Sequence, residues 1–137
     1  MNAHDAGREL RVKAAMLAGI TSDRFLNKKN AGHEFYGVVI KDFGDFSFFD
    51  LQAKFLLGHI TEEEFKKRMD KGNEWEAAAA YVIGLARWNR GDLNGAVAAY
   101  NLCLAKINLN GYTPPETLPQ KWAWADLKEI KKQLHRR

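Results

Sequence analysis

The chain has little cysteine or proline and no long hydrophobic run, and each of these absences excludes a class of protein. One cysteine in 137 residues excludes a disulfide framework and a zinc cluster built from several cysteines. Three prolines and eleven glycines exclude collagen and low-complexity linkers. No stretch approaches the roughly 18 consecutive apolar residues that a membrane span needs, and the N-terminus lacks the apolar region of a signal peptide. We therefore expect a protein of a reducing compartment, cytoplasmic by default, with no membrane partner.

The composition that remains is that of an ordinary globular protein. Hydrophobic residues make up 46% of the chain and charged residues 28%, which excludes a disordered chain. A chain of 137 residues can bury a core without disulfide or metal support. We predict that residues 1–137 form a single helical domain.

The positive charge is concentrated at the C-terminus. The net charge is +4, yet residues 1–119 carry 15 basic and 15 acidic side chains and sum to zero. Residues 120–137 carry six basic and two acidic side chains, so the whole excess lies there. This distribution indicates a local basic segment on a neutral body.

Hydrophobic periodicity predicts a mostly α-helical chain. In the first helix Leu10, Ala14 and Leu17 recur at helical spacing, and Gly19 suits its end. The run 34–42 is apolar and short, so it fits either a strand at 35–40 or a buried helix. The predicted helices cover 5–19, 46–58, 61–70, 74–90, 93–106 and 119–135, and 111–115 is a predicted loop.

Two helices carry clear local signals. Thr61 and Glu64 have the spacing of a capping box, in which the hydroxyl accepts from the amide three residues later. The last helix has Pro119 in its first turn. Its apolar residues share one face, and its lysines lie on the other; the apolar set is Ala123, Leu127, Ile130 and Leu134.

Residues 77–110 are predicted to form a helical hairpin with a turn at Gly91-Asp92. Gly84 lies in the middle of a helix, where glycine costs roughly 1 kcal/mol relative to alanine. We expect it to allow close helix–helix approach, with Ala96 facing it. Together with Ile83, Tyr100 and Cys103, this pattern resembles a tetratricopeptide repeat, although Ala80, Arg87 and Asn108 depart from it. The spacing of Gly84, Gly91 and Asp92 also occurs earlier in the chain, at Gly37, Gly44 and Asp45.

The resemblance implies a short stack of antiparallel hairpins that binds another protein. The expected stack is a hairpin at 31–58, an inserted helix, a hairpin at 74–106 and a C-terminal capping helix. In this family the inner face of the first helix binds peptides, and here that face carries Ala78, Tyr81, Leu85, Trp88 and Asn89. We expect a non-catalytic scaffold without cofactor or metal, whose partner is a protein, a peptide or a second copy of the chain. The alternative is that these aromatics fill the core.

A shorter resemblance covers residues 58–65. The segment Gly58-His59-Ile60-Thr61 followed by three glutamates and Phe65 is similar to the core of the SHOCT motif, which is linked to oligomerisation. An ordinary capped helix explains the same residues.

Three further functions stay open. The basic tail could bind nucleic acid or an acidic partner, with Trp122 and Trp124 stacking on bases, or it solvates a cap; its cations are Lys128, Lys131, Lys132, Arg136 and Arg137. An enzyme would bring His33 and Glu34 together with Asp42 or Asp45. Self-association would use the aromatic cluster Phe46, Phe48 and Phe49. Cys103 is expected to be an inert packed thiol.

Overall fold

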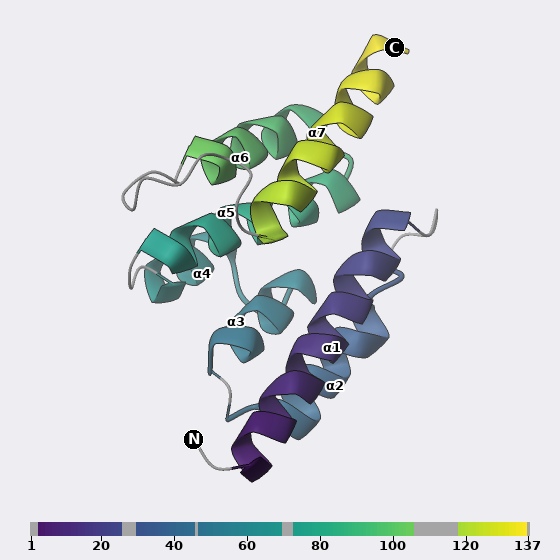
Figure 1. Cartoon of the computed structure of the whole chain (residues 1–137). Helices are drawn as coiled ribbons and strands as arrows, with labels where there is room; N and C mark the ends of the chain where they lie inside the picture. Colours follow the sequence, from purple (N-terminus) through teal and green to yellow (C-terminus); the bar gives the residue numbers. More distant parts are fainter. Residues whose placement is uncertain (1–2, 26–29, 46, 70–72, 106–117, 137) are drawn as a thin grey trace. The chain divides into compact units, whose positions relative to one another are not determined.

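The protein is all-α, as the sequence predicts. A computed structural model describes residues 3–25, 30–45, 47–69, 73–105 and 118–136 (Figure 1). These residues form seven helices and no strand. None of these helices is both long enough and apolar enough to cross a membrane. The helices are α1 (Ala3–Phe25), α2 (His33–Phe43), α3 (Ser47–Leu56), α4 (Glu62–Met69), α5 (Asn73–Asn89), α6 (Leu93–Ala105) and α7 (Leu118–His135).

The chain divides into two compact units where the sequence was interpreted as one domain. Unit 1 comprises residues 1–68 and unit 2 comprises residues 69–137. Some residues named in the sequence analysis lie outside the described residues, namely the predicted loop at 111–115, Phe46 and Arg137. Each unit is described by itself below.

In unit 1, α1 and α2 pack side by side as an antiparallel pair (Figure 1). At one end the Asp23 carboxylate accepts hydrogen bonds from the Gly32 amide, at 2.7 Å, and from the Tyr36 hydroxyl, at 2.6 Å. At the other end Arg8 donates to both carboxylate oxygens of Asp45, at 2.6 and 2.8 Å. The two contacts clamp the pair at both ends. Helix α2 also packs against α3, the pair of helices that the predicted hairpin at 31–58 contains.

The apolar residues that recur at helical spacing in α1, Leu10, Ala14 and Leu17, do not form its buried face. Leu10 and Leu17 are 69% and 43% exposed, and Ala14 between them is exposed too. The buried stripe lies on the opposite side and consists of Val12, Met16, Gly19 and Ile20. Gly19 does not end the helix, which continues to Phe25; a Cβ there would collide with the Tyr36 ring. Close packing of Tyr36 therefore explains this glycine.

Residues 34–42 are helical, which excludes the strand at 35–40. Tyr36 and Val39 in α2 have no exposed surface. Burial and the neighbouring Asp23 carboxylate raise the pKa of Tyr36 above its ordinary value, so its hydroxyl stays a donor. The short apolar run is thus part of a helix packed against α1 and α3, in which Tyr36 and Val39 are buried and Phe35 and Val38 are exposed.

The start of α4 has the predicted cap. The Thr61 hydroxyl accepts a hydrogen bond from the Glu64 amide at 3.1 Å, which satisfies one free donor of the first turn. Phe65 of α4 stacks on Phe55 of α3, with ring centroids 4.6 Å apart. This contact holds α4 against α3.

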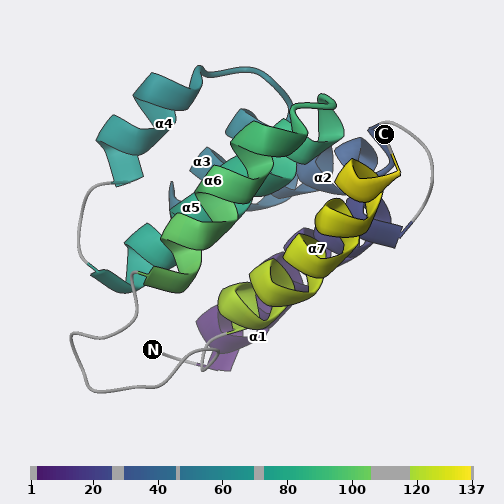
Figure 2. The same ribbon diagram turned by 90° about the horizontal axis from the view of Figure 1, so that it is seen from above.

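Unit 2 is a hairpin, α5 and α6, with α7 packed against both helices (Figures 1 and 2). Gly91 has φ of +85° and makes the turn, a conformation that glycine adopts without strain. Tyr81 of α5 contacts Asp126 of α7. Seven residues further along both helices, Trp88 contacts Gln133. Helix α7 therefore runs parallel to α5.

Gly84 provides the close approach expected between α5 and α6, but against a different residue. A Cβ at Gly84 would lie 2.6 Å from Cδ1 and Cε1 of Tyr100, and these are its nearest atoms. The Tyr100 ring, which is fully buried, therefore lies over the glycine in place of the predicted Ala96. The space that a Cβ of residue 84 would occupy is therefore filled by the ring of Tyr100.

Replacing Gly84 by alanine should destabilise unit 2 by about 1–3 kcal/mol, because the new methyl group overpacks a buried ring. All four tryptophans of the chain lie in unit 2, so tryptophan fluorescence during urea unfolding reports on this unit. In a Tyr100→Leu background the same substitution should be neutral or stabilising, since alanine is the better helix former. A penalty of equal size in that background would show that the ring is not its cause.

Candidate functional site

The face of α5 that the sequence assigns to a partner is largely occupied by the chain itself. Tyr81 and Leu85 are 1% and 0% exposed. The Tyr81 hydroxyl donates to Oδ2 of Asp126 at 3.0 Å, and its ring lies 5.5 Å from the ring of Trp122. Tyr81 and Leu85 therefore do not line an open groove.

The remaining predicted groove residues are partly accessible. Trp88 and Asn89, at the end of α5, are half-buried, as is Ala78. Nε1 of Trp88 donates to Oε1 of Gln133 at 3.3 Å, so this indole is also held by α7.

Helix α7 turns its apolar face into unit 2, as predicted. Ala123, Leu127 and Ile130 are at most 4% exposed, and Leu134 is half-buried. Asp126 is buried among them and bonded to Tyr81, a role that the sequence analysis missed. Its spacing from Ala123 and Ile130 places it on the apolar face, so helical periodicity could have found it.

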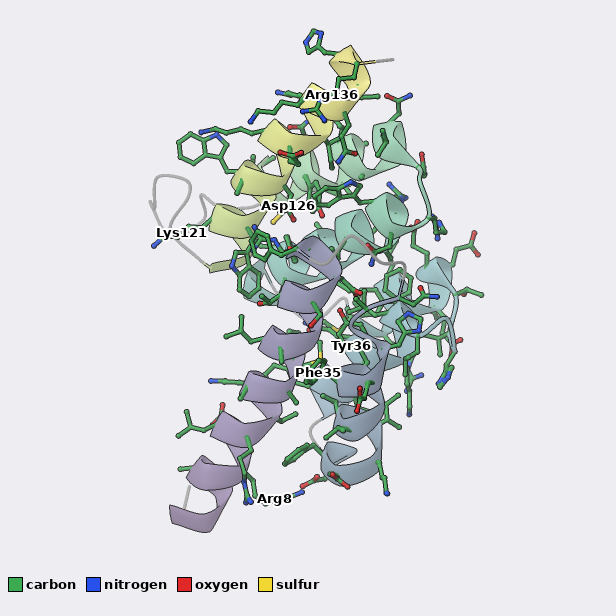
Figure 3. All side chains as sticks on the ribbon, turned by 90° about the vertical axis from the view of Figure 1, so that its right-hand side faces the viewer. Arg8, Phe35, Tyr36, Lys121, Asp126 and Arg136 are labelled. Atoms are coloured by element: carbon green, nitrogen blue, oxygen red, sulfur yellow. The ribbon has the colours of Figure 1, made fainter. Side chains whose placement is uncertain are left out.

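The opposite side of α7, its outer face, is basic and carries an exposed indole. It consists of Lys121, Trp124, Lys128, Lys132 and Arg136, all of them exposed. Lys121 and Arg136 lie near the two ends of the helix, with Asp126 between them (Figure 3). Lys131 is exposed at the margin of this face. The spacing of three, four and four residues from 121 to 132 puts these side chains on one stripe, opposite the buried one.

Trp124 is the aromatic member of the outer face. Its side chain is 49% exposed, and Nζ of Lys128 lies 4.6 Å from the centroid of its ring. A cation at this distance from an indole face is attracted by the ring. Of the two acidic residues of α7, Asp126 is buried and Glu129 is exposed, and the charged residues of the outer face itself are all cations. This arrangement can hold an anionic partner and offer it a stacking surface.

The structure does not bring the predicted acid–base residues together. His33 begins α2 and packs on Tyr36, whereas Asp42 lies nine residues further along the same helix, about 13 Å away along the axis. The Arg8 guanidinium bonded to Asp45 holds the pKa of that carboxyl below its usual value. Asp45 thus serves the clamp between α1 and the end of α2.

Three other expectations can be placed. In the part of the chain that the structure describes, no three His, Cys, Asp or Glu side chains gather as metal ligands. Phe48 and Phe49 are half-buried and meet edge to face at 5.1 Å. Cys103 is fully buried, as expected for a packed thiol.

Comparisons with known proteins found no match to any family model, curated protein or solved structure. The resemblances of residues 77–110 and 58–65 to known families stay predictions.

Proposed function

We propose that this chain is a non-catalytic interaction module that docks on nucleic acid through the outer face of α7. The observation that carries the proposal is the exposed stripe of cations beside Trp124 on a helix whose other face is buried. The whole positive excess of the chain lies in the last 18 residues, and α7 holds half of it.

The anchoring of α7 supports this proposal. A helix that binds a ligand through its surface charges must keep its orientation when the ligand binds. Helix α7 is held against α5 by apolar packing and by the hydrogen bonds of Asp126 and Gln133. The hairpin α5–α6 then acts as the scaffold that presents the cations. Because lysine ammonium groups attract phosphates without reading bases, binding of this kind is independent of sequence.

A protein partner along α5, the function that the tetratricopeptide resemblance implies, is the second candidate. Trp88 and Asn89 remain partly accessible at the end of α5 and are the residues that such a partner would reach first. This candidate requires α7 to move away from Tyr81, because their contact covers the face that the partner would use. The outer face of α7 can bind a ligand without such a rearrangement. For this reason we propose nucleic-acid binding as the function.

The proposal predicts an affinity for nucleic acid that falls steeply with salt. An interface that neutralises about four phosphates gives log K against log salt a slope of about −2.8 for a single strand. Between about 50 and 200 mM salt the affinity should therefore drop about 50-fold. Fluorescence anisotropy of a labelled oligonucleotide, titrated with the full chain, measures it.

A matched pair of triple variants locates the interface. Replacing Lys121, Lys128 and Lys132 by glutamine should flatten the salt slope by about 2, since each lysine accounts for one phosphate. The control variant replaces three exposed lysines of unit 1 and removes the same charge; they are Lys13, Lys41 and Lys67. It should keep the wild-type slope. If the salt slope decreased equally in both variants, binding would depend only on the net charge of the chain, and this result would contradict the proposal.

A further inference from the structure

We infer that the outer face of α7 selects single-stranded over duplex nucleic acid, with Trp124 as the residue that stacks on a base. This inference rests on the proposed function and names its ligand class. The observation that carries it is the position of the exposed Trp124 indole within the stripe of lysines.

The first step concerns what an exposed indole can contact. Trp124 lies one turn before Lys128 and one turn after Lys121, so cations stand on both sides of it along the helix. Every base has a flat π-face, but in a duplex these faces are covered by neighbouring base pairs. A single strand can turn a base onto the indole while its flanking phosphates reach the lysines, which is how single-strand binding surfaces combine charge and stacking.

The second step concerns the kind of cation. The residues nearest to Trp124 on the outer face are lysines, and the arginine of this face, Arg136, lies at its far end. Lysine is a point charge that suits a phosphate, whereas bidentate reading of guanine in a duplex groove is done mainly by arginine. The surface is therefore suited to backbone contact plus stacking, with no sequence preference expected.

The third step separates nucleic acid from other anionic surfaces. An amphipathic helix that lies in a membrane inserts its apolar face, but the apolar face of α7 is buried within unit 2. An acidic protein segment satisfies the lysines and leaves the indole unused. Stacking is the contact that single-stranded nucleic acid makes and these alternatives do not.

The test compares three probes with the wild type, Trp124→Phe and Trp124→Leu. The probes are a labelled oligothymidylate of about 20 nucleotides, a duplex of the same length and poly-glutamate. Because Trp124 is half exposed and contributes no charge, both variants should fold, and circular dichroism checks this. For the single strand we expect the affinity order Trp, Phe, Leu, with Trp124→Leu weaker by about fivefold or more. Duplex affinity should change by less than about twofold, because phosphate contacts are unchanged.

A second readout is the indole itself. Saturation with oligothymidylate should quench part of the tryptophan fluorescence in the wild type, and this part should be missing in Trp124→Phe. The other three tryptophans are common to both proteins, so the difference isolates Trp124.

The outcomes distinguish the inference from the function on which it rests. If Trp124→Leu binds both nucleic acids as the wild type does, or loses affinity for both equally, the stacking inference is wrong while charge-driven docking stands. If the wild type binds neither nucleic acid, the proposed function falls as well. Poly-glutamate binding as tight as that of the single strand would assign the surface to an acidic protein segment and overturn the inference.

Discussion

Replacing Leu85 by alanine should lower the free energy of unfolding of unit 2 by about 2–5 kcal/mol. Leu85 has no exposed surface, so the substitution removes buried methyl groups and leaves a cavity that the neighbouring side chains fill only in part. Urea unfolding followed by tryptophan fluorescence measures the loss. A loss of this size identifies Leu85 as a core residue, so any effect of the variant on partner binding would follow from instability.

Leu102 provides the matched control. It is also a helical leucine of unit 2, but it is 50% exposed on α6. Leu102→Ala should change the free energy of unfolding by no more than about 0.5 kcal/mol, as is usual for surface positions. Similar values for the two variants would mean that Leu85 is not part of the core and would return it to the candidate binding residues.

The thiol of Cys103 should react with a disulfide reagent about a thousandfold more slowly in the folded protein than in the unfolded chain. Burial disfavours the thiolate and raises the pKa of Cys103 from its ordinary value of 9.0 to about 12. Because the thiolate is the reactive form, a rise of this size lowers its population at pH 8 by about a thousandfold. The absorbance of the released reagent anion measures the rate, with and without urea.

An exposed cysteine one residue away is the control for this rate. In a Cys103→Ala background, Leu102→Cys places a thiol on the same turn of α6 at an exposed position. It should react at nearly the same rate in the folded and unfolded protein. Fast labelling of wild-type Cys103 without urea would show that α6 opens at this point and would contradict its assignment as a packed thiol.

The raised pKa of Cys103 also determines in which direction the stability of the folded state changes with pH. The folded state keeps the Cys103 proton at pH values at which the unfolded chain has lost it. The stability that this group contributes is therefore fully present below pH 9 and is lost as the pH rises from about 9 to about 12.

The outer face of α7 could be predicted because its signals are local. Lys121, Lys128 and Lys132 lie opposite an apolar stripe, and helical periodicity alone places the two sets on opposite sides. The same periodicity places Asp126 on the apolar side of α7. Its bond to Tyr81 could not be predicted, since that contact joins residues 45 positions apart in the sequence.

The burial of Tyr81 and Leu85, which the sequence assigns to a binding groove, could not be predicted for a different reason. An apolar helix face has the same pattern whether it binds a partner or a later helix of the same chain. The pattern of α5 cannot distinguish these cases, and the packing of α7 decides between them.

Helix α1 poses a similar ambiguity, because it carries apolar residues on two opposite sides. Leu10 and Leu17 recur at helical spacing on one side, while Val12 and Met16 do so on the other. The contact between Gly19 and the Tyr36 ring sets which side faces α2, and no local rule predicts it.

The helical class, the positions of most helices, the cap of α4 and the two faces of α7 follow from local sequence patterns, because they depend on residues within a few turns of one another. Long-range packing, in contrast, makes residues 34–42 a helix, places Tyr100 over Gly84, and selects which apolar faces are buried. These outcomes depend on steric fit between segments far apart in the chain, where one glycine or one ring selects among arrangements that local periodicity leaves equivalent.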